Sequence, residues 1–177
     1  RQLAFVANEA GTSRLHLLNT VTRRSRRLQT VPLGILGGLE WRAGGRELGF
    51  TLSTARTAAD AYSVDVVSGQ LTRWTESETG GLDTSTLPEP ELVRWTSFDG
   101  REISGFLYRP PARFTGARPV MISIHGGPEG QATPGFLGRT NYFVAELGIA
   151  VLLPNVRGST GYGKTFVKLD NGMRRED

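Results

Sequence analysis

Cysteine is absent from the 177 residues, which excludes disulfide bridges and thiolate metal sites. No apolar run approaches the roughly 20 residues that a membrane-spanning helix needs. The chain begins with arginine instead of methionine and continues directly into a strand-like pattern, so its start does not resemble a signal peptide and we expect a segment of a longer protein. Hydrophobic residues make up 38% of the chain and charged residues 21%, which is typical of a globular protein.

Positive charge is in slight excess, with a net charge of +4. Its densest cluster, at residues 23–27, contains four arginines among turn-like residues and separates two strand-like runs. No aromatic interleaving or groove-reading motif accompanies this cluster, so we interpret it as the solvated face of a hairpin. We expect neither a nucleic acid nor a membrane as partner.

Two copies of a strand pattern fill the first part of the chain. Residues 1–6 align with residues 46–51, and residues 16–19 align with residues 62–65, which gives a period of about 45 residues. Each copy contains a strand-like run, a polar link, a second strand-like run and a turn. Several short strands at this period are typical of β-propeller blades.

Residues 39–50 are the most specific part of this repeat. They resemble the Trp-Ser-Pro-Asp-Gly-Lys-x-Leu-Ala-Phe hairpin of propellers related to the TolB type, with departures at residues 42–44. The resemblance implies about two blades in residues 1–74, which is too few to close a ring, and a chain that begins inside a blade. We expect His16 to be structural and the aromatic residues of the repeat to pack within the blades. These aromatic residues are Trp41, Phe50, Tyr62 and Trp74.

A change of composition divides the chain after the repeat. Residues 75–90 are polar, contain paired glycines and end in Pro-Glu-Pro, a pattern that predicts a linker. Two strand-like runs follow at residues 92–98 and 102–108, on either side of Asp99 and Gly100. An Asp-Gly pair between two such runs predicts a β-hairpin.

The remaining residues predict a parallel strand–helix–strand unit. Residues 120–124 form a short apolar run that predicts a buried strand. Residues 141–147 predict a helix that ends at Gly148, and residues 149–153 predict a second continuous apolar strand. This order is typical of parallel α/β sheets. We expect another helix from about Lys164.

A glycine loop follows the first of these apolar strands. It consists of His125, Gly126, Gly127 and Pro128, and it lies where open α/β sheets place their ligands. Paired glycines allow the backbone to approach a bound group or to adopt positive φ. In α/β-hydrolases a loop of this type supplies one N–H of the oxyanion hole. A tight turn without chemistry is the alternative interpretation.

A second glycine-rich loop, at residues 154–163, follows the other apolar strand. It does not match a phosphate-binding loop, because the spacing from Gly158 to Lys164 is wrong. Arg157 in this loop could pair either with a substrate carboxylate or with a structural acid.

The order of these motifs resembles the prolyl oligopeptidase family of serine peptidases, and above all its acylaminoacyl-peptidase and dipeptidyl-peptidase-like members. The resemblance covers nearly the whole chain. It implies a mixed β and α/β fold, in which residues 1–74 are the end of a β-propeller and residues 75–90 are a linker. Residues 91–177 would be the N-terminal part of an α/β-hydrolase domain.

The same resemblance implies roles for individual residues. Gly127 would donate its backbone N–H to the oxyanion hole, in a loop that also contains His125 and Gly126. Asn155 and Arg157 would shape the floor of the site and contact substrate. The complete enzyme would cleave short peptides through an acyl-enzyme, without a cofactor or metal.

A catalytic triad is not expected within these residues. No Gly-x-Ser-x-Gly occurs, and the nearest string, at residues 158–161, has the wrong spacing for a nucleophile. In α/β-hydrolases the triad follows in the order Ser, Asp, His, but both histidines, His16 and His125, precede any place for that serine. We therefore expect the chain to be inactive alone.

Two other functions stay open. The chain could be a binding or assembly module that self-associates through unpaired strand edges. It could also come from a carboxylesterase, although lipases and esterases usually carry a third glycine where Pro128 stands and lack a propeller.

Overall fold

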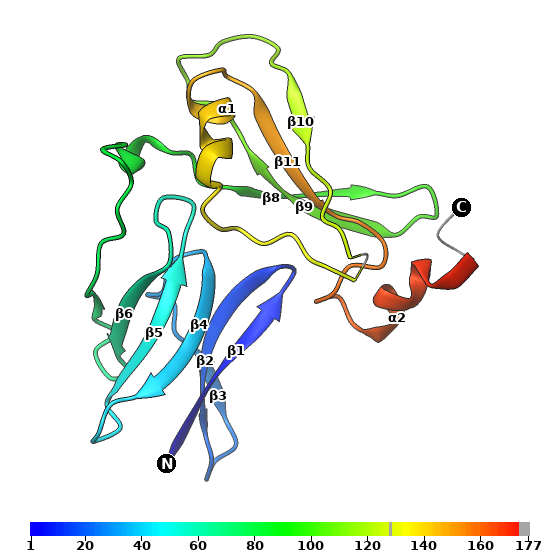
Figure 1. The fold of residues 1–177 in the computed structure, drawn as a ribbon. Coiled ribbons are helices and arrows are strands. Elements are labelled where there is room, and N and C mark those ends of the chain that lie inside the picture. Colours follow the sequence, from blue (N-terminus) through cyan, green and yellow to red (C-terminus); the bar gives the residue numbers. More distant parts are fainter. Residues whose placement is uncertain (128, 174–177) are drawn as a thin grey trace.

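The computed structural model describes residues 1–127 and 129–173 of the chain and shows three β-sheets with few helices (Figure 1). The first two sheets come from the repeat and are antiparallel throughout. The first contains β1 (Gln2–Glu9), β2 (Thr12–Asn19) and β3 (Ser25–Arg27). The second contains β4 (Ile35–Trp41), β5 (Glu47–Ser53), β6 (Asp60–Asp65) and β7 (Leu71–Arg73).

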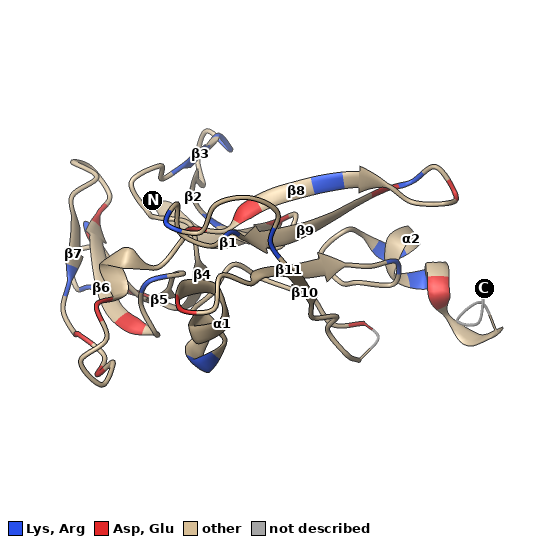
Figure 2. Cartoon of the chain, turned by 90° about the horizontal axis from the view of Figure 1, so that it is seen from above, with Lys and Arg blue, Asp and Glu red and all other residues tan. Residues whose placement is uncertain are grey.

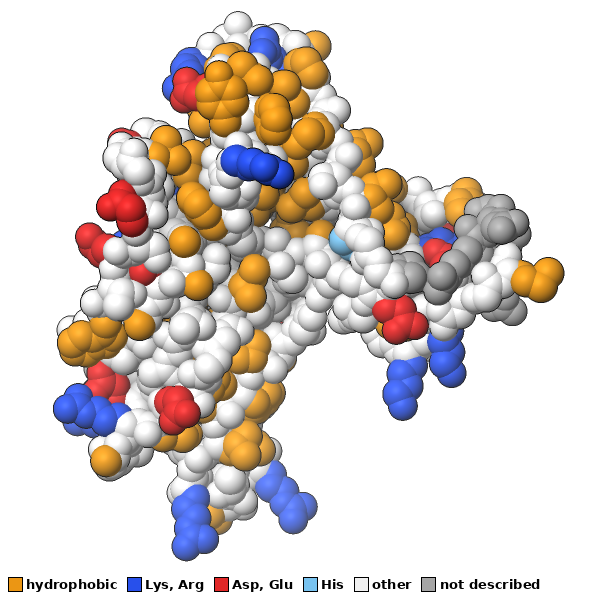
Figure 3. Space-filling view, viewed as in Figure 1, with side chains coloured by type: hydrophobic (Ala, Val, Ile, Leu, Met, Phe, Trp, Pro, Cys, Tyr) orange, Lys and Arg blue, Asp and Glu red, His pale blue; other side chains and the backbone are white. Residues whose placement is uncertain are grey.

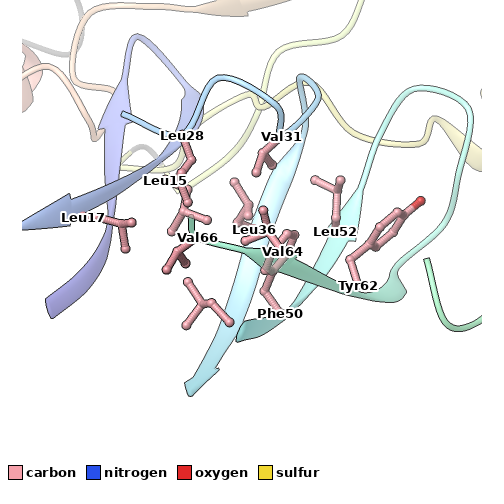
Figure 4. Packing of buried hydrophobic residues seen from close by; sticks show 11 residues of the cluster. Leu15, Leu17, Leu28, Val31, Leu36, Phe50, Leu52, Tyr62, Val64 and Val66 are labelled. Atoms are coloured by element: carbon pink, nitrogen blue, oxygen red, sulfur yellow. The ribbon is translucent and has the colours of Figure 1, made fainter. Parts of the chain in front are cut away.

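The two copies of the repeat form strands in the same order. In the first sheet β2 lies between β1 and β3, and in the second β6 lies between β5 and β7. Alternate side chains of these strands point into one shared core (Figure 4). Leu48, Leu52 and Val64 are fully buried there. Apolar burial between the two sheets therefore stabilises this half of the chain.

Most of the repeat's aromatic residues pack as predicted, but the prediction for Trp74 is wrong. Phe50 and Tyr62 are buried and stacked, with ring centroids 6.3 Å apart, and Trp41 packs against the same core. The Trp74 side chain is 63% exposed. It lies on the opposite face of the second sheet, where its indole N–H donates to the hydroxyl of Ser63.

His16 stacks on a neighbouring ring within the first sheet. Its imidazole lies parallel to Phe5, with ring centroids 5.2 Å apart, and its Nε2 is 3.4 Å from a carboxylate oxygen of Glu9. These contacts give it the structural place that its alignment with Tyr62 predicts.

The third sheet is mixed and has the strand order β10-β11-β9-β8. The predicted hairpin is confirmed, because β8 and β9 pair in antiparallel fashion around Gly100, whose φ is 78°. The predicted parallel pair is confirmed as well, between β10 and β11. The strands of this sheet are β8 (Glu91–Thr96), β9 (Glu102–Tyr108), β10 (Val120–Ile122) and β11 (Ala150–Asn155).

Helix α1 (Asn141–Ala145) connects β10 to β11 and packs against the sheet through Val144, which is fully buried. The predicted helix is confirmed, but it ends at Ala145, two residues before the predicted end, and Gly148 follows in the connection to β11 with φ of 65°. Helix α2 (Lys164–Val167) begins at the predicted residue.

The prediction that the run at residues 120–124 is buried is wrong. β10 is the edge strand of the third sheet, and the side chains of Val120, Ile122 and Ile124 are each more than half exposed. A continuous apolar run indicates a strand that is covered on both faces. Within the part of the chain that the structure describes, nothing covers this strand's outer side.

A connecting segment, residues 129–137, joins the mixed sheet to the first half of the chain. The ring of Phe106 and the backbone carbonyl of Ala132 lie so close to Gly11 that a Cβ there would come within 2.8 Å of each. Tyr108 is fully buried and donates its hydroxyl to the carbonyl of Gly135. Burial, followed by the nearby Glu89 carboxylate, raises the pKa of Tyr108, which therefore stays a neutral donor.

Charged residues of both signs are spread over the three sheets (Figure 2). The arginines at residues 23–27 are exposed around the β2–β3 turn, as predicted. Among the described residues, no helix is both long and apolar enough to cross a membrane.

Candidate functional site

Two glycine-rich loops leave the same edge of the mixed sheet, because β10 and β11 run parallel. The loop after β10 contains His125, Gly126 and Gly127, and the loop after β11 contains Arg157 and Ser159. Ligands of open α/β sheets bind at this carboxyl edge. The structure thus brings together the two loops that the sequence singles out.

Hydrogen bonds join the two loops directly. His125 Nε2 lies 2.8 Å from the hydroxyl oxygen of Ser159. The backbone N–H of Thr160 in the second loop donates over 3.0 Å to the carbonyl of Gly130, in the connecting segment that continues the first loop. The two loops therefore form one unit and not two independent turns.

Gly127 has a backbone conformation that favours glycine. Its φ is 132°, and a Cβ at this position would lie 2.9 Å from the backbone nitrogen of Gly130 and 3.2 Å from that of Glu129. A side chain would force the loop open. The use of its N–H toward an oxyanion stays a prediction, and Pro128 lies outside the described residues.

Asn155 ends β11 and is fully buried. Its side-chain oxygen accepts from the N–H of Ala132 over 2.7 Å, and its amide nitrogen donates to the carbonyl of Ala132 over 3.1 Å. This pair of bonds fixes the connecting segment against the sheet. The predicted contact of Asn155 with substrate stays a prediction.

Arg157 pairs with acids from two other parts of the chain. Its guanidinium lies 3.4 Å from a carboxylate oxygen of Asp99 and 3.1 Å from one of Asp170. It also lies over the ring of Phe98, 5.0 Å from its centroid. Arg157 thus ties the tip of the β8–β9 hairpin to the second loop; its predicted substrate contact stays a prediction.

Sequence reasoning missed two residues that organise the second loop. The sequence assigns no contact to Ser159, yet this residue is fully buried and bonded to His125. Tyr162 shares a hydrogen bond of 2.7 Å with the hydroxyl of Ser104 on β9. Their place in a glycine-rich loop was the one available signal, because the partners lie far away in the sequence.

The described residues contain no group of three or more His, Cys, Asp or Glu side chains that could hold a metal ion.

No family model matches the chain. Among curated proteins, it is 35% identical over 89 residues to an uncharacterized peptidase, YuxL, of Bacillus subtilis, which covers 49% of this chain and 13% of that protein. It is 44% identical over 54 residues to dipeptidyl aminopeptidase BIII of Pseudoxanthomonas mexicana, which covers 30% of this chain and 8% of that protein. The chain therefore spans only a small part of these relatives.

Solved structures give a wider match. A crystal structure of puromycin hydrolase aligns with a TM-score of 0.75 and 27% identity, covering 93% of this chain and 25% of that one. A puromycin-hydrolyzing peptidase of Mycobacterium tuberculosis aligns with a TM-score of 0.77 and 23% identity, covering 93% of this chain and 26% of that one, which shows a shared fold. The resemblance predicted from the sequence is thus confirmed: the chain matches, as a segment, peptidases of the prolyl oligopeptidase and acylaminoacyl-peptidase family.

Proposed function

We propose that this chain is the part of a serine peptidase that carries the oxyanion loop. In this proposal residues 1–74 belong to a β-propeller, residues 75–90 are a linker, and residues 91–177 begin an α/β-hydrolase domain. The conformation of Gly127 carries the proposal. Its loop, restricted to glycine, stands at the carboxyl edge of a parallel strand pair, where an α/β-hydrolase would stabilise the tetrahedral intermediate.

The proposed reaction is hydrolysis of short peptides through an acyl-enzyme. When a nucleophile attacks the scissile carbonyl, negative charge develops on its oxygen, and the N–H of Gly127 would donate to that oxygen. One such preorganised donor contributes about 3 to 4 kcal/mol to stabilisation of the transition state. The peptidase activity of the relatives supports this substrate class.

The His125–Ser159 pair has the separation of a base and a nucleophile, but Ser159 is not the proposed nucleophile. Its side chain is fully buried, and its hydroxyl already donates to the carbonyl of Val156 over 2.6 Å. A peptide carbonyl cannot reach a buried hydroxyl. The serine nucleophile, with its Asp and His partners, would have to come from outside these 177 residues.

Intact mass after treatment with a fluorophosphonate tests the proposal. A full-length protein that carries this chain together with a nucleophile should gain one adduct and hydrolyse acylaminoacyl or dipeptidyl p-nitroanilides. The 177 residues alone should gain no adduct and turn over no substrate. Labelling of Ser159 in the isolated chain would show that it carries the nucleophile itself and would contradict the proposed mechanism.

Substitution of Gly127 tests its role in the full-length protein. We expect Gly127→Ala to lower kcat about 100-fold with little change in KM, because the displaced N–H would act only in the transition state. Gly116→Ala is the matched control, since Gly116 also has positive φ but lies in open space in the β9–β10 connection. Equal losses in both variants would mean that backbone strain, and not oxyanion binding, explains the effect.

The exposed edge of the mixed sheet favours self-association as a second candidate function. Apolar side chains gather over α1 and the adjoining strands (Figure 3). Among the described residues no strand pairs with the outer side of β10, and such an edge can pair with a second copy. Light scattering across a concentration series should detect dimers that Ile122→Lys abolishes. A monomer at every concentration would exclude this candidate.

A further inference from the structure

His125 and Ser159 lie 34 residues apart and meet only because β10 and β11 are parallel neighbours. Their contact is enclosed on the serine side, since Ser159 is fully buried, and half-buried on the histidine side. A hydrogen bond in such a place is screened less by water than one on the surface, and its loss leaves an unpaired buried group.

The hydrogen positions in this contact follow from the partners of Ser159. The serine hydroxyl has one proton, and it donates that proton to the carbonyl of Val156 over 2.6 Å. Its oxygen can therefore only accept from His125, so Nε2 of His125 must carry a proton. The buried serine thus requires a proton on Nε2 of the imidazole ring.

The orientation of this ring affects the backbone of the glycine loop. His125 directly precedes Gly126, and its Nδ1 lies 3.2 Å from the carbonyl oxygen of Gly126. A Cβ at Gly130 would lie 2.4 Å from that carbonyl oxygen and 2.9 Å from Nδ1. The ring therefore lies against Gly126 and Gly130, so a rotation of the ring would displace the backbone at these two residues.

Ser159 is itself held in place by the second loop. Its backbone N–H donates to the carbonyl of Val156 over 3.1 Å, which closes a tight turn with Gly158 at φ of 86°. Arg157, in the same turn, is anchored by Asp99 and Asp170. The Ser159 hydroxyl oxygen, which accepts from His125, is therefore held in place without a bound substrate.

We infer that Ser159 is a positioning residue, which holds His125 in the Nε2-protonated state and thereby fixes the backbone of the glycine loop around Gly127. The importance of this positioning for catalysis rests on the proposed function, because only an oxyanion loop needs the N–H of Gly127 at one fixed position. The contact itself can be tested without any activity.

Nitrogen-15 NMR of the imidazole tests the inference in the 177-residue chain. In the wild type we expect His125 Nε2 to carry a proton, and in Ser159→Ala we expect this preference to be lost. Amide exchange of Thr160, which bonds across to Gly130, should accelerate about tenfold as the loops separate. Ser104→Ala is the matched control, since it removes another buried hydroxyl that contacts the same loop, at Tyr162, without touching His125.

A second pair of variants keeps the test decisive if Ser159→Ala fails to fold. His125→Gln retains an N–H donor at a similar reach, whereas His125→Leu has none. Protection of the Thr160 amide should persist in the first variant and fall in the second. An unchanged ring state in Ser159→Ala, or equal protection in the two His125 variants, would overturn the inference. Absence of peptidase activity in the full-length protein, beside an intact ring state in the 177-residue chain, would count against the proposed function alone.

Discussion

The Asp65 carboxylate has partners on both oxygens. Oδ1 accepts from the backbone N–H groups of Val67 and Ser68, each over 2.9 Å, and Oδ2 accepts from Arg46 over 2.6 Å. The N–H of Ser68, followed by the Arg46 side chain, lowers the pKa of Asp65 to about 2. The ionised carboxylate is therefore more stable in the folded protein than in the unfolded chain, where the pKa of an aspartate is about 3.9.

This difference predicts an acid-dependent contribution to stability. Because the folded pKa is depressed, the stabilisation is present above pH of about 4 and is lost as the pH falls toward 2. Thermal unfolding measured across this window should show a smaller loss of stability in Asp65→Asn than in the wild type. Arg46→Gln, which removes the donor to Oδ2 and leaves the two backbone donors to Oδ1, should lose stability with falling pH to an intermediate extent. Identical slopes in all three proteins would contradict the assignment.

Asp60 is a buried carboxylate, only 1% exposed, on the second sheet. Burial alone would raise its pKa, but hydrogen bonds from Arg73, Thr75 and Ser77 outweigh burial and hold the pKa below its usual value. We expect Asp60→Ala to lower the free energy of unfolding by about 2 to 3 kcal/mol, since it leaves these donors without an acceptor. Urea denaturation measures this change.

Glu76→Ala is the control for that measurement. Glu76 lies 4.0 Å from the same Arg73, but its side chain is 85% exposed. Its removal should cost at most about 0.5 kcal/mol. Comparable losses in both variants would mean that proximity to Arg73, and not the buried network, determines the stability.

At the scale of single elements, Gly105 in β9 has no room for a side chain. It lies between β8 and β11, and a Cβ would come within 2.9 Å of the Leu153 carbonyl and of the Pro154 Cα. We expect Gly105→Ala to lower the free energy of unfolding by about 1 to 3 kcal/mol, because backbone atoms cannot move aside cheaply. A lower melting temperature would report this effect.

Gly49 in β5 provides the opposite case within the same protein. The atoms nearest to a Cβ there are 3.7 Å and 3.9 Å away, so Gly49→Ala meets no obstacle. This variant should be neutral or more stable by about 0.5 kcal/mol, since alanine loses less conformational entropy than glycine on folding. If both glycine variants lost stability equally, close approach of β11 would not be the reason for glycine at position 105.

The sequence predicted elements that depend on local patterns. The Asp99-Gly100 pair predicted the β8–β9 hairpin, and the strand–helix–strand pattern predicted α1 between two parallel strands. The sequence did not predict which other elements pack beside or over each strand. The apolar residues of β10 are exposed because that strand lies at an edge, and Trp74 is exposed because it lies on the sheet face away from the core. Periodicity identifies a strand but not its neighbours.

At the candidate site, too, the sequence predicts local features but not contacts between distant residues. Glycine spacing located both loops, and glycine at position 127 agrees with its φ of 132°. The contact of His125 with Ser159, and that of Arg157 with Asp99, depend on which strands lie side by side. Such long-range pairs cannot be deduced from one sequence without the sheet order.

At the scale of the whole molecule, the first sheet reaches the candidate site through the β1–β2 turn. The amide of Asn8 donates to Gln131 over 2.7 Å, and the Gln131 amide lies 3.4 Å from the Asn8 side-chain oxygen. A Cβ at Gly161 would come within 2.2 Å of Gln131, so the second loop also closes on this pair. The amide pair thus joins the repeat to the connecting segment and to the second glycine-rich loop.

A double-mutant cycle measures this connection. The single variants Asn8→Ala and Gln131→Ala, combined, should show a coupling energy of about 0.5 to 1 kcal/mol in the free energy of unfolding, since each variant alone already breaks the shared bonds. Asn8→Ala combined with Gln70→Ala, on the distant β6–β7 turn, should be additive. Additivity in both cycles would mean that the amide pair does not join the two halves. Their association would then rest on the close approach of Gly11 to the Phe106 ring and to the backbone carbonyl of Ala132.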